Sequence, residues 1–64
     1  MQYFVEVVNQ SGSLAPLACR SLSSAGTKAL NLLNRMKDKD GFVCVRIIDE
    51  DGKEQARLIY SPSN

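Results

Sequence analysis

Histidine is absent from this 64-residue chain, and cysteine occurs twice. The nucleophile–base pairs of most hydrolases and the ligand sets of most zinc sites draw on histidine. Cys19 and Cys44 alone are too few soft ligands for a metal ion. The acidic turn at residues 49–51 is expected in solvent, which does not raise carboxylate pKa values as acid catalysis requires. We therefore expect a protein that is not an enzyme and that holds no metal and no cofactor.

Long apolar runs are also lacking, and we expect no secretory signal. No run approaches the roughly 20 apolar residues that span a bilayer. The apolar segment Tyr3–Val8 is too short for a signal peptide and contains Glu6. We therefore expect a cytoplasmic protein with no membrane segment and with free thiols. A Cys19–Cys44 disulfide would require Cα atoms within about 7 Å.

One amphipathic helix is the clearest pattern that the sequence does contain. Its apolar stripe recurs at steps of three and four residues: Leu22, Ala25, Ala29, Leu32, Leu33 and Met36. Ser21 is a natural N-cap, the helix is expected to end near Lys37, and Gly41 suits its closing residue. Gly26 inside the helix indicates either close approach to a sheet or a helix that starts later, at Ser23 or Ser24.

Four strands are expected around this helix. They are Gln2–Asn9, Leu14–Arg20, Phe42–Ile48 and Glu54–Tyr60, with Asp51-Gly52 as a hairpin turn between the last two. Pro16 lacks an amide hydrogen, so the second strand should lie at an edge or be interrupted by a bulge. The fold class is α+β: a four-stranded, mainly antiparallel sheet in the order β-β-α-β-β, with one helix packed on one face. We expect residues 1–60 to form a single domain and residues 61–64 a disordered tail.

Strand alternation divides the side chains between two faces of the sheet. The face toward the helix is expected to carry Tyr3, Val5, Val7, Val43, Val45, Ile47, Ala56, Leu58 and Tyr60. The other face would show Phe4, Val8, Phe42, Cys44, Ile48 and Ile59, with Glu6, Arg46 and Arg57 among them. This second set is unusually apolar for a surface in water, so we expect something to cover it.

Two sets of residues are candidate binding sites. Phe4, Phe42, Arg46, Arg57 and Ile59 combine arginines with apolar neighbours, as in protein interfaces and in base-stacking platforms. The aliphatic residues beside the arginines, Val8, Ile48 and Ile59, favour a protein partner. Lys28, Asn31 and Arg35 share the outer face of the helix without an acidic residue and would suit phosphates. The net charge of +1 does not decide for or against nucleic acid.

The arrangement resembles small phage and mobile-element proteins. The resemblance rests on the first strand Gln2–Val8, the capped helix start at residues 21–25 and the closing hairpin Val45–Lys53. Some inhibitors of type I CRISPR surveillance complexes are similar in architecture. The resemblance implies a phage-encoded protein of the host bacterial cytoplasm that blocks a binding surface without catalysis. The near-neutral charge departs from the acidic, DNA-mimicking members of that class.

The sequence therefore predicts a non-enzymatic inhibitor or accessory protein that docks on a larger protein assembly, with a CRISPR effector complex as the most concrete target. A small nucleic-acid-binding or regulatory protein is one alternative. A homodimeric structural protein is the other, because a chain this short often needs a second subunit to complete its core.

Overall fold

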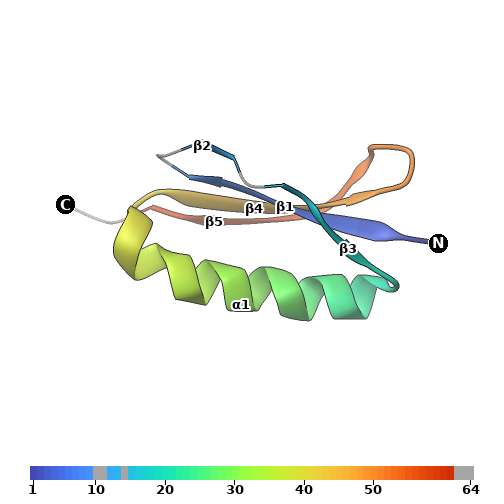
Figure 1. Cartoon of the computed structure of the whole chain (residues 1–64), viewed down its shortest axis with the longest axis horizontal. Helices are drawn as coiled ribbons and strands as arrows, with labels where there is room; N and C mark the ends of the chain where they lie inside the picture. Colours follow the sequence, from blue (N-terminus) through green and yellow to red (C-terminus); the bar gives the residue numbers. More distant parts are fainter. Residues whose placement is uncertain (10–11, 14, 62–64) are drawn as a thin grey trace.

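A computed structural model describes residues 1–9, 12–13 and 15–61 and shows one helix packed across one face of a sheet (Figure 1). The elements are β1 (Tyr3–Asn9), β2 (Gly12–Ser13), β3 (Leu17–Cys19), α1 (Leu22–Asp40), β4 (Val43–Asp49) and β5 (Glu54–Tyr60). All strand pairs are antiparallel. The predicted α+β class, with a mainly antiparallel sheet and one helix, is confirmed.

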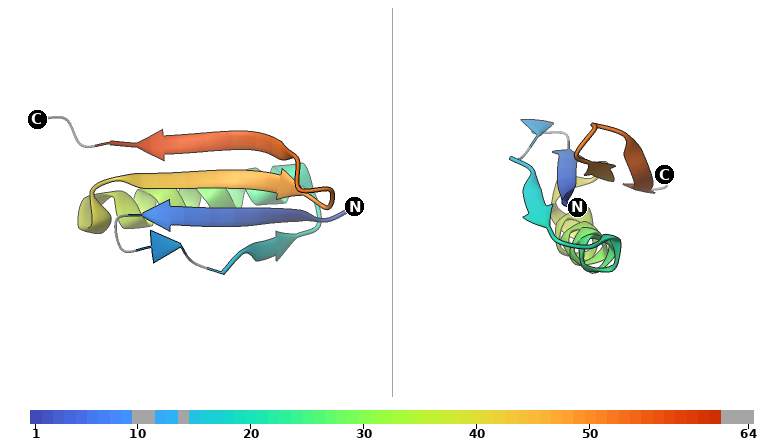
Figure 2. Two further views of the ribbon diagram at one scale, coloured as in Figure 1. Left: turned by 90° about the horizontal axis from the view of Figure 1, so that it is seen from above. Right: turned by 90° about the vertical axis from the view of Figure 1, so that its right-hand side faces the viewer.

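The sheet has β1 and β4 at its centre. Both β2 and β3 pair with β1, and β4 pairs with β1 and β5, so the order is β2/β3–β1–β4–β5 (Figure 2). The central pair runs in unbroken register from Tyr3 opposite Asp49 to Asn9 opposite Val43. The hairpin of β1 with β2 and β3 therefore pairs with the β4–β5 hairpin through their first strands, β1 and β4. Helix α1 connects β3 to β4 and packs on one face of the sheet.

The predicted second strand is interrupted. Val8 lies opposite Ser13, whereas Val5 lies opposite Leu17, so the second strand contains one more residue than β1 between these pairs. Three residues, 14–16, thus stand against two residues of β1, which is the count that defines a bulge, and Pro16 is one of the three. The expectation that Pro16 places this strand at an edge or breaks it is confirmed, and this edge of the sheet is short and irregular.

Helix α1 begins and ends with the expected caps. Ser21 has extended dihedrals (φ −138°, ψ 161°), and its Oγ accepts from the Ser24 amide at 3.1 Å. Gly41 follows the helix with a positive φ of 71°, which favours glycine. The helix runs to Asp40, three residues beyond the expected end at Lys37.

The core lies between α1 and the two central strands. Its buried residues are small: Val5, Val7, Cys19, Ala25, Ala29, Val43, Val45 and Ile47. Ala25 and Ala29 are fully buried, because their short side chains let the helix lie close to the sheet. Leu32, Leu33 and Met36 pack against this core as predicted. Leu22 was wrongly included in the buried stripe, since it is 45% exposed in the first turn of α1.

Both explanations for Gly26 were wrong. The helix already begins at Leu22, and a Cβ placed on Gly26 would meet no atom within 4 Å. Gly26 therefore serves neither close packing nor a later helix start in this structure.

Some sequence expectations fall outside the described residues. These are Gln10 and Ser11, which with Gly12 and Ser13 predict a turn from their composition, the strand start at Leu14, and positions 62–64 of the expected tail. Ser61 follows β5 and is exposed.

The open environment of Gly26 yields a stability prediction. Gly26→Ala should raise the free energy of unfolding by about 1 kcal/mol, because alanine restricts the unfolded chain and is the better helix former. Thermal denaturation should show an increase of about 4 to 8 °C in Tm. Gly52→Ala is the contrasting variant: Gly52 has a φ of 82°, so alanine should destabilise there. A Gly26→Ala protein that melts lower than wild type would contradict this account.

Candidate functional site

The sheet face opposite α1, here called the outer face, is arranged in three rows across the strands. The register places Ala18, Phe4, Ile48 and Glu54 in the first row. Glu6, Arg46 and Arg57 make the second. Ser13, Val8, Cys44 and Ile59 make the third. A charged row therefore runs between two largely apolar rows.

The outer face is uncovered but only moderately exposed. Phe4, Val8, Cys44 and Ile48 are half-buried by their neighbours on the sheet. The most exposed large apolar side chains here are Ile59, at 56%, and Phe42, at 38% just before β4 begins. No pocket forms among the described residues, so this surface offers a broad contact area and no enclosed site.

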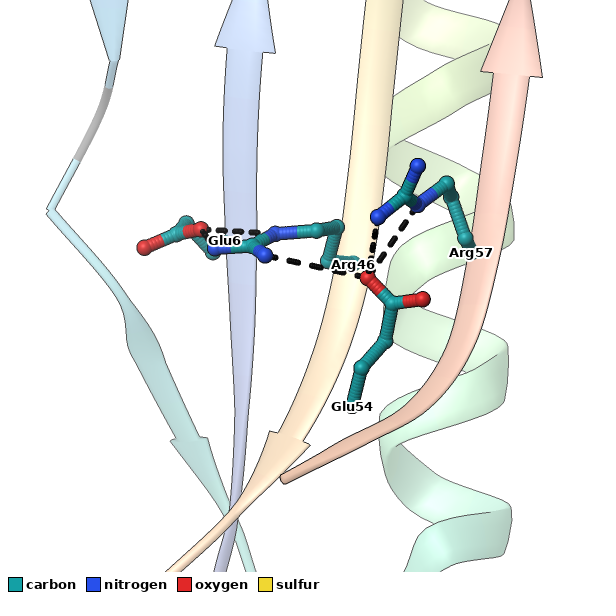
Figure 3. Close-up of polar contacts among 4 residues, drawn as sticks. All are labelled: Glu6, Arg46, Glu54 and Arg57. Atoms are coloured by element: carbon teal, nitrogen blue, oxygen red, sulfur yellow. Dashed lines mark hydrogen bonds and ion pairs between the residues drawn. The ribbon is translucent and has the colours of Figure 1, made fainter. Parts of the chain in front are cut away.

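The charged row forms an ion-pair network with Glu54 of the first row, across β1, β4 and β5 (Figure 3). Arg46 Nε donates to Glu6 Oε1 at 2.9 Å, and Arg46 Nη2 donates to the same oxygen. Arg46 Nη1 lies 3.7 Å from Glu54 Oε1. Arg57 donates to that same Glu54 oxygen through Nη2 at 2.8 Å and through Nε at 3.1 Å. Two arginines are thus matched by two carboxylates.

This network determines the electrostatics of the outer face. The hydrogen bond to Glu6, and the charge of Glu6, raise the pKa of Arg46 above its ordinary value, so Arg46 stays charged. The formal charges of the four side chains sum to zero. Arg46 and Arg57 were predicted on neighbouring strands, and they lie directly opposite each other. Their guanidinium groups are engaged within the protein and do not form a free basic patch.

The two phenylalanines of the predicted site lie at different ends of the outer face. Phe4 occupies the first row, diagonal to Arg46, because Phe4 faces Ile48 and Glu6 faces Arg46. Phe42 precedes β4, beyond the third row. Ile59 faces Cys44 in the third row. Phe4, Arg46, Arg57 and Ile59 therefore share the outer face, whereas Phe42 lies beyond its third row, and the five residues do not form one tight cluster.

Glu54 is the residue of this network that sequence reasoning missed. Simple alternation along Glu54–Tyr60 places Glu54 with Ala56 and Leu58 on the helix side. The register shifts between Ile47 and Ile48, so that Ile47 faces Ala56 but Ile48 faces Glu54. This irregularity skips Gln55 and turns Glu54 to the outer face. Two consecutive polar residues at the start of a strand were the one available signal.

The predicted polar residues of the helix lie on the other side of the sheet. Lys28, Asn31 and Arg35 are all exposed on α1. Their spacing of three and four residues keeps them on one helical face, as expected. They are separated by the sheet from Arg46 and Arg57, so the two candidate binding sets do not combine into one surface.

The two cysteines are free and lie on opposite faces of the sheet. Cys19 is buried opposite Tyr3 on the helix side, and Cys44 is half-buried opposite Val8 on the outer face. Tyr3 and Val8 are about 16 Å apart along an extended strand. A disulfide within one copy of the chain is therefore excluded by geometry. No group of three or more His, Cys, Asp or Glu side chains gathers among the described residues.

The hairpin between β4 and β5 is organised by Asp49. Asp49 Oδ1 accepts from the amides of Asp51 and Lys53, both at 2.9 Å, and Oδ2 accepts from Gln55 Nε2 at 2.8 Å. The Lys53 amide contributes most to lowering the pKa of Asp49 below its ordinary value of 3.8; partial burial opposes this, and the Asp51 and Gln55 bonds add to the lowering. The carboxylate has a structural role in the turn.

The ion-pair network predicts a measurable coupling between Glu6 and Arg46. A double-mutant cycle with Glu6→Gln and Arg46→Gln should show a small positive coupling, because the pair is partly exposed and screened by solvent. High salt should reduce this value. Urea denaturation measures it, and a cycle between Glu6→Gln and Lys28→Gln, on opposite sides of the sheet, is the matched control. Equal coupling in both cycles would refute a specific pair.

Asp49 predicts a loss of stability in acid. Its folded-state pKa lies below the unfolded value, so the charged carboxylate stabilises the fold at pH values above the ordinary range of aspartate. This contribution is lost as the pH falls through the folded-state pKa. Asp49→Asn should therefore be less stable than wild type at pH 7, with a difference that shrinks below about pH 4. Asp51→Asn, the same charge removal in the same turn, controls for net charge. A difference independent of pH would contradict the role of Asp49.

Comparisons with protein-family models, with curated proteins and with solved structures give no match. The resemblance to type I anti-CRISPR inhibitors therefore stays a prediction. Within the described residues, α1 lacks the apolar length needed to cross a membrane. A function for this chain has to follow from its own residues and their geometry.

Proposed function

We propose that this chain is a non-catalytic binding protein that docks its outer face on the surface of another protein. One observation carries the proposal: no element of the described chain covers the outer face, and its two largely apolar rows lie on either side of a charged row whose net charge Glu54 of the first row balances. A partner that removes the apolar side chains of these two rows from water lowers the free energy of the complex.

The charge balance favours a protein partner over nucleic acid. Binding to phosphates depends on cationic side chains that displace counterions. Arg46 and Arg57 already contact Glu6 and Glu54, and a phosphate approaching them would also meet these carboxylates. Aliphatic residues such as Val8 and Ile59 have no role in phosphate binding, but they suit the apolar centre of a protein interface.

The resemblance described above suggests one specific partner. A phage-encoded inhibitor would act in the host cytoplasm and would block a working surface of a type I CRISPR surveillance complex. In that setting the near-neutral outer face would act by steric occlusion, because it lacks the acidic charge of a DNA mimic. This target is the finer part of the proposal, and docking through the outer face is the broader part.

Nucleic-acid binding through Lys28, Asn31 and Arg35 is the second candidate. The observation in its favour is that these exposed residues share one helical face and that no acidic residue occurs between Leu22 and Lys37. Two cations give only weak, salt-sensitive binding, so this candidate ranks lower.

Two substitutions on the outer face test the proposal. Ile59→Glu and Phe42→Glu place a carboxylate on its most exposed apolar residues, and Leu17→Glu is the matched control on the helix side of β3, where Leu17 is 42% exposed. Binding to an immobilised, purified type I surveillance complex should weaken about 100-fold in the first two variants, since burying an unpaired carboxylate costs several kcal/mol. The control should bind as wild type does, and circular dichroism checks that all three fold.

Different outcomes overturn different parts of the proposal. Wild-type protein that does not bind the complex removes the CRISPR target. Capture from host lysate then tests the broader part: a protein retained by the Leu17→Glu variant must be lost with Ile59→Glu. Binding to a DNA duplex at physiological salt that is abolished by Lys28→Glu and Arg35→Glu, but not by Ile59→Glu, would replace docking by nucleic-acid binding.

A further inference from the structure

A second surface lies open beside the helix, along β5. An α-helix is about 10 Å across, whereas four strand positions about 4.8 Å apart span about 15 Å. Helix α1 therefore covers the two central strands and leaves the helix side of β5 uncovered. Val43 and Val45 are fully buried under it, while Ala56 on β5, which belongs to the helix side, is exposed. Leu58 and Tyr60 on the same side of β5 are only partly buried.

The flank of α1 beside this surface is apolar. Seen from the helix N-terminus with the sheet above, β5 lies to the right of α1 (Figure 2, right). A right-handed helix turns clockwise in this view, so the residues that follow Ala25 and Ala29 lie on the β5 side. These are Gly26, which has open space around it, and Leu30, which is 51% exposed. The exposed Leu22 lies one turn before Gly26 on the same flank.

The two edges of the sheet differ in how they are protected. At the β2/β3 edge, the bulge and Pro16 interrupt the strand, which hinders pairing with another chain. Strand β5 is a run of seven residues without proline or glycine, and its register shift, at Gln55, lies near its start, so Ala56–Tyr60 is regular. In the described part of the chain, no strand pairs with the edge of β5 that points away from β4. Such an edge is a template for a further strand.

We infer that β5 pairs antiparallel with β5 of a second copy of this chain, about a two-fold axis at Leu58. This register places Leu58 opposite Leu58 and Ala56 opposite Tyr60 on the helix side, which matches a small residue with a large one. On the outer face it places Arg57 opposite Ile59. A two-fold axis at Arg57 would instead put two guanidinium groups directly opposite each other, which is unfavourable.

A second copy fits this surface because the surface complements itself. The net charge of +1 imposes little repulsion between copies. The two-fold axis is perpendicular to the sheet, so both helices lie on one side of the joined sheet. Leu58 and Tyr60 of each copy then extend the small core across the join, adding apolar burial that a core of valines and alanines lacks. The dimer does not depend on the function proposed above, since it uses the strand edge and the helix side.

Sedimentation equilibrium across a dilution series, from micromolar to near-millimolar chain, tests the dimer. Wild type should shift from monomer to dimer over this range. Ala56→Glu should weaken the dimer about tenfold or more, because a carboxylate enters the apolar join. Ala18→Glu is the matched control, since Ala18 is an exposed alanine of the opposite edge strand β3. A wild-type monomer at every concentration, or equal weakening by both variants, would overturn the inference.

The charge at position 59 tests the register. Ile59→Arg should weaken the dimer by placing two guanidinium groups opposite each other, whereas Ile59→Glu should retain it by facing Arg57 of the other copy. Ile59→Glu that loses partner binding but still dimerises separates the two proposals. Hydrogen exchange of wild-type protein gives a readout without substitution: β5 amides should gain protection as the concentration rises. Protection gained on β3 instead would contradict pairing through β5.

Discussion

The rest of the structure depends on the contact that Ala25 and Ala29 make with the central strands. Both alanines are fully buried against a layer of valines and one isoleucine, so the helix lies close to β1 and β4. One helix is narrower than the sheet and covers one face of it. Two surfaces therefore remain without a covering layer: the whole outer face, and the helix side of β5. The position of the helix thus defines where this small protein can meet other molecules.

The outer face, which no helix covers, remains in water because charged side chains cross its middle. Its charged row joins three strands through Glu6, Arg46, Glu54 and Arg57, and these partly exposed side chains keep solvent contact. Partly exposed ion pairs contribute little to stability. Their effect on recognition is larger, because a partner that dehydrated this row would have to leave the pairs intact or replace their hydrogen bonds. The apolar side chains of the flanking rows have no hydrogen bonds to replace when they are dehydrated, so burying them is what stabilises a complex.

The sequence predicted most of the fold because its local signals agree with one another. The caps Ser21 and Gly41, the alternating strands and the turn ending at Gly52 all lie where their chemistry requires. What it did not predict depends on register. The position of Glu54 follows from a bulge that alternation alone does not reveal. The strand order, with β1 beside β4, depends on long-range pairing that no local pattern specifies. Leu22 is exposed because it lies on the flank of α1 beside β5 and not on the face that Ala25 and Ala29 turn toward the core.

The two uncovered surfaces are geometrically linked. Antiparallel pairing of β5 about an axis perpendicular to the sheet keeps the outer faces of both copies on the same side. The rows of one copy would then continue toward those of the other, with Ile59 and Arg57 meeting at the join. A dimer would present a surface about twice as wide, still electrically balanced, and a partner with repeated subunits could engage both halves at once. Linking two weak contacts in this way strengthens binding without any new contact. This suits an outer face on which the described residues form no pocket.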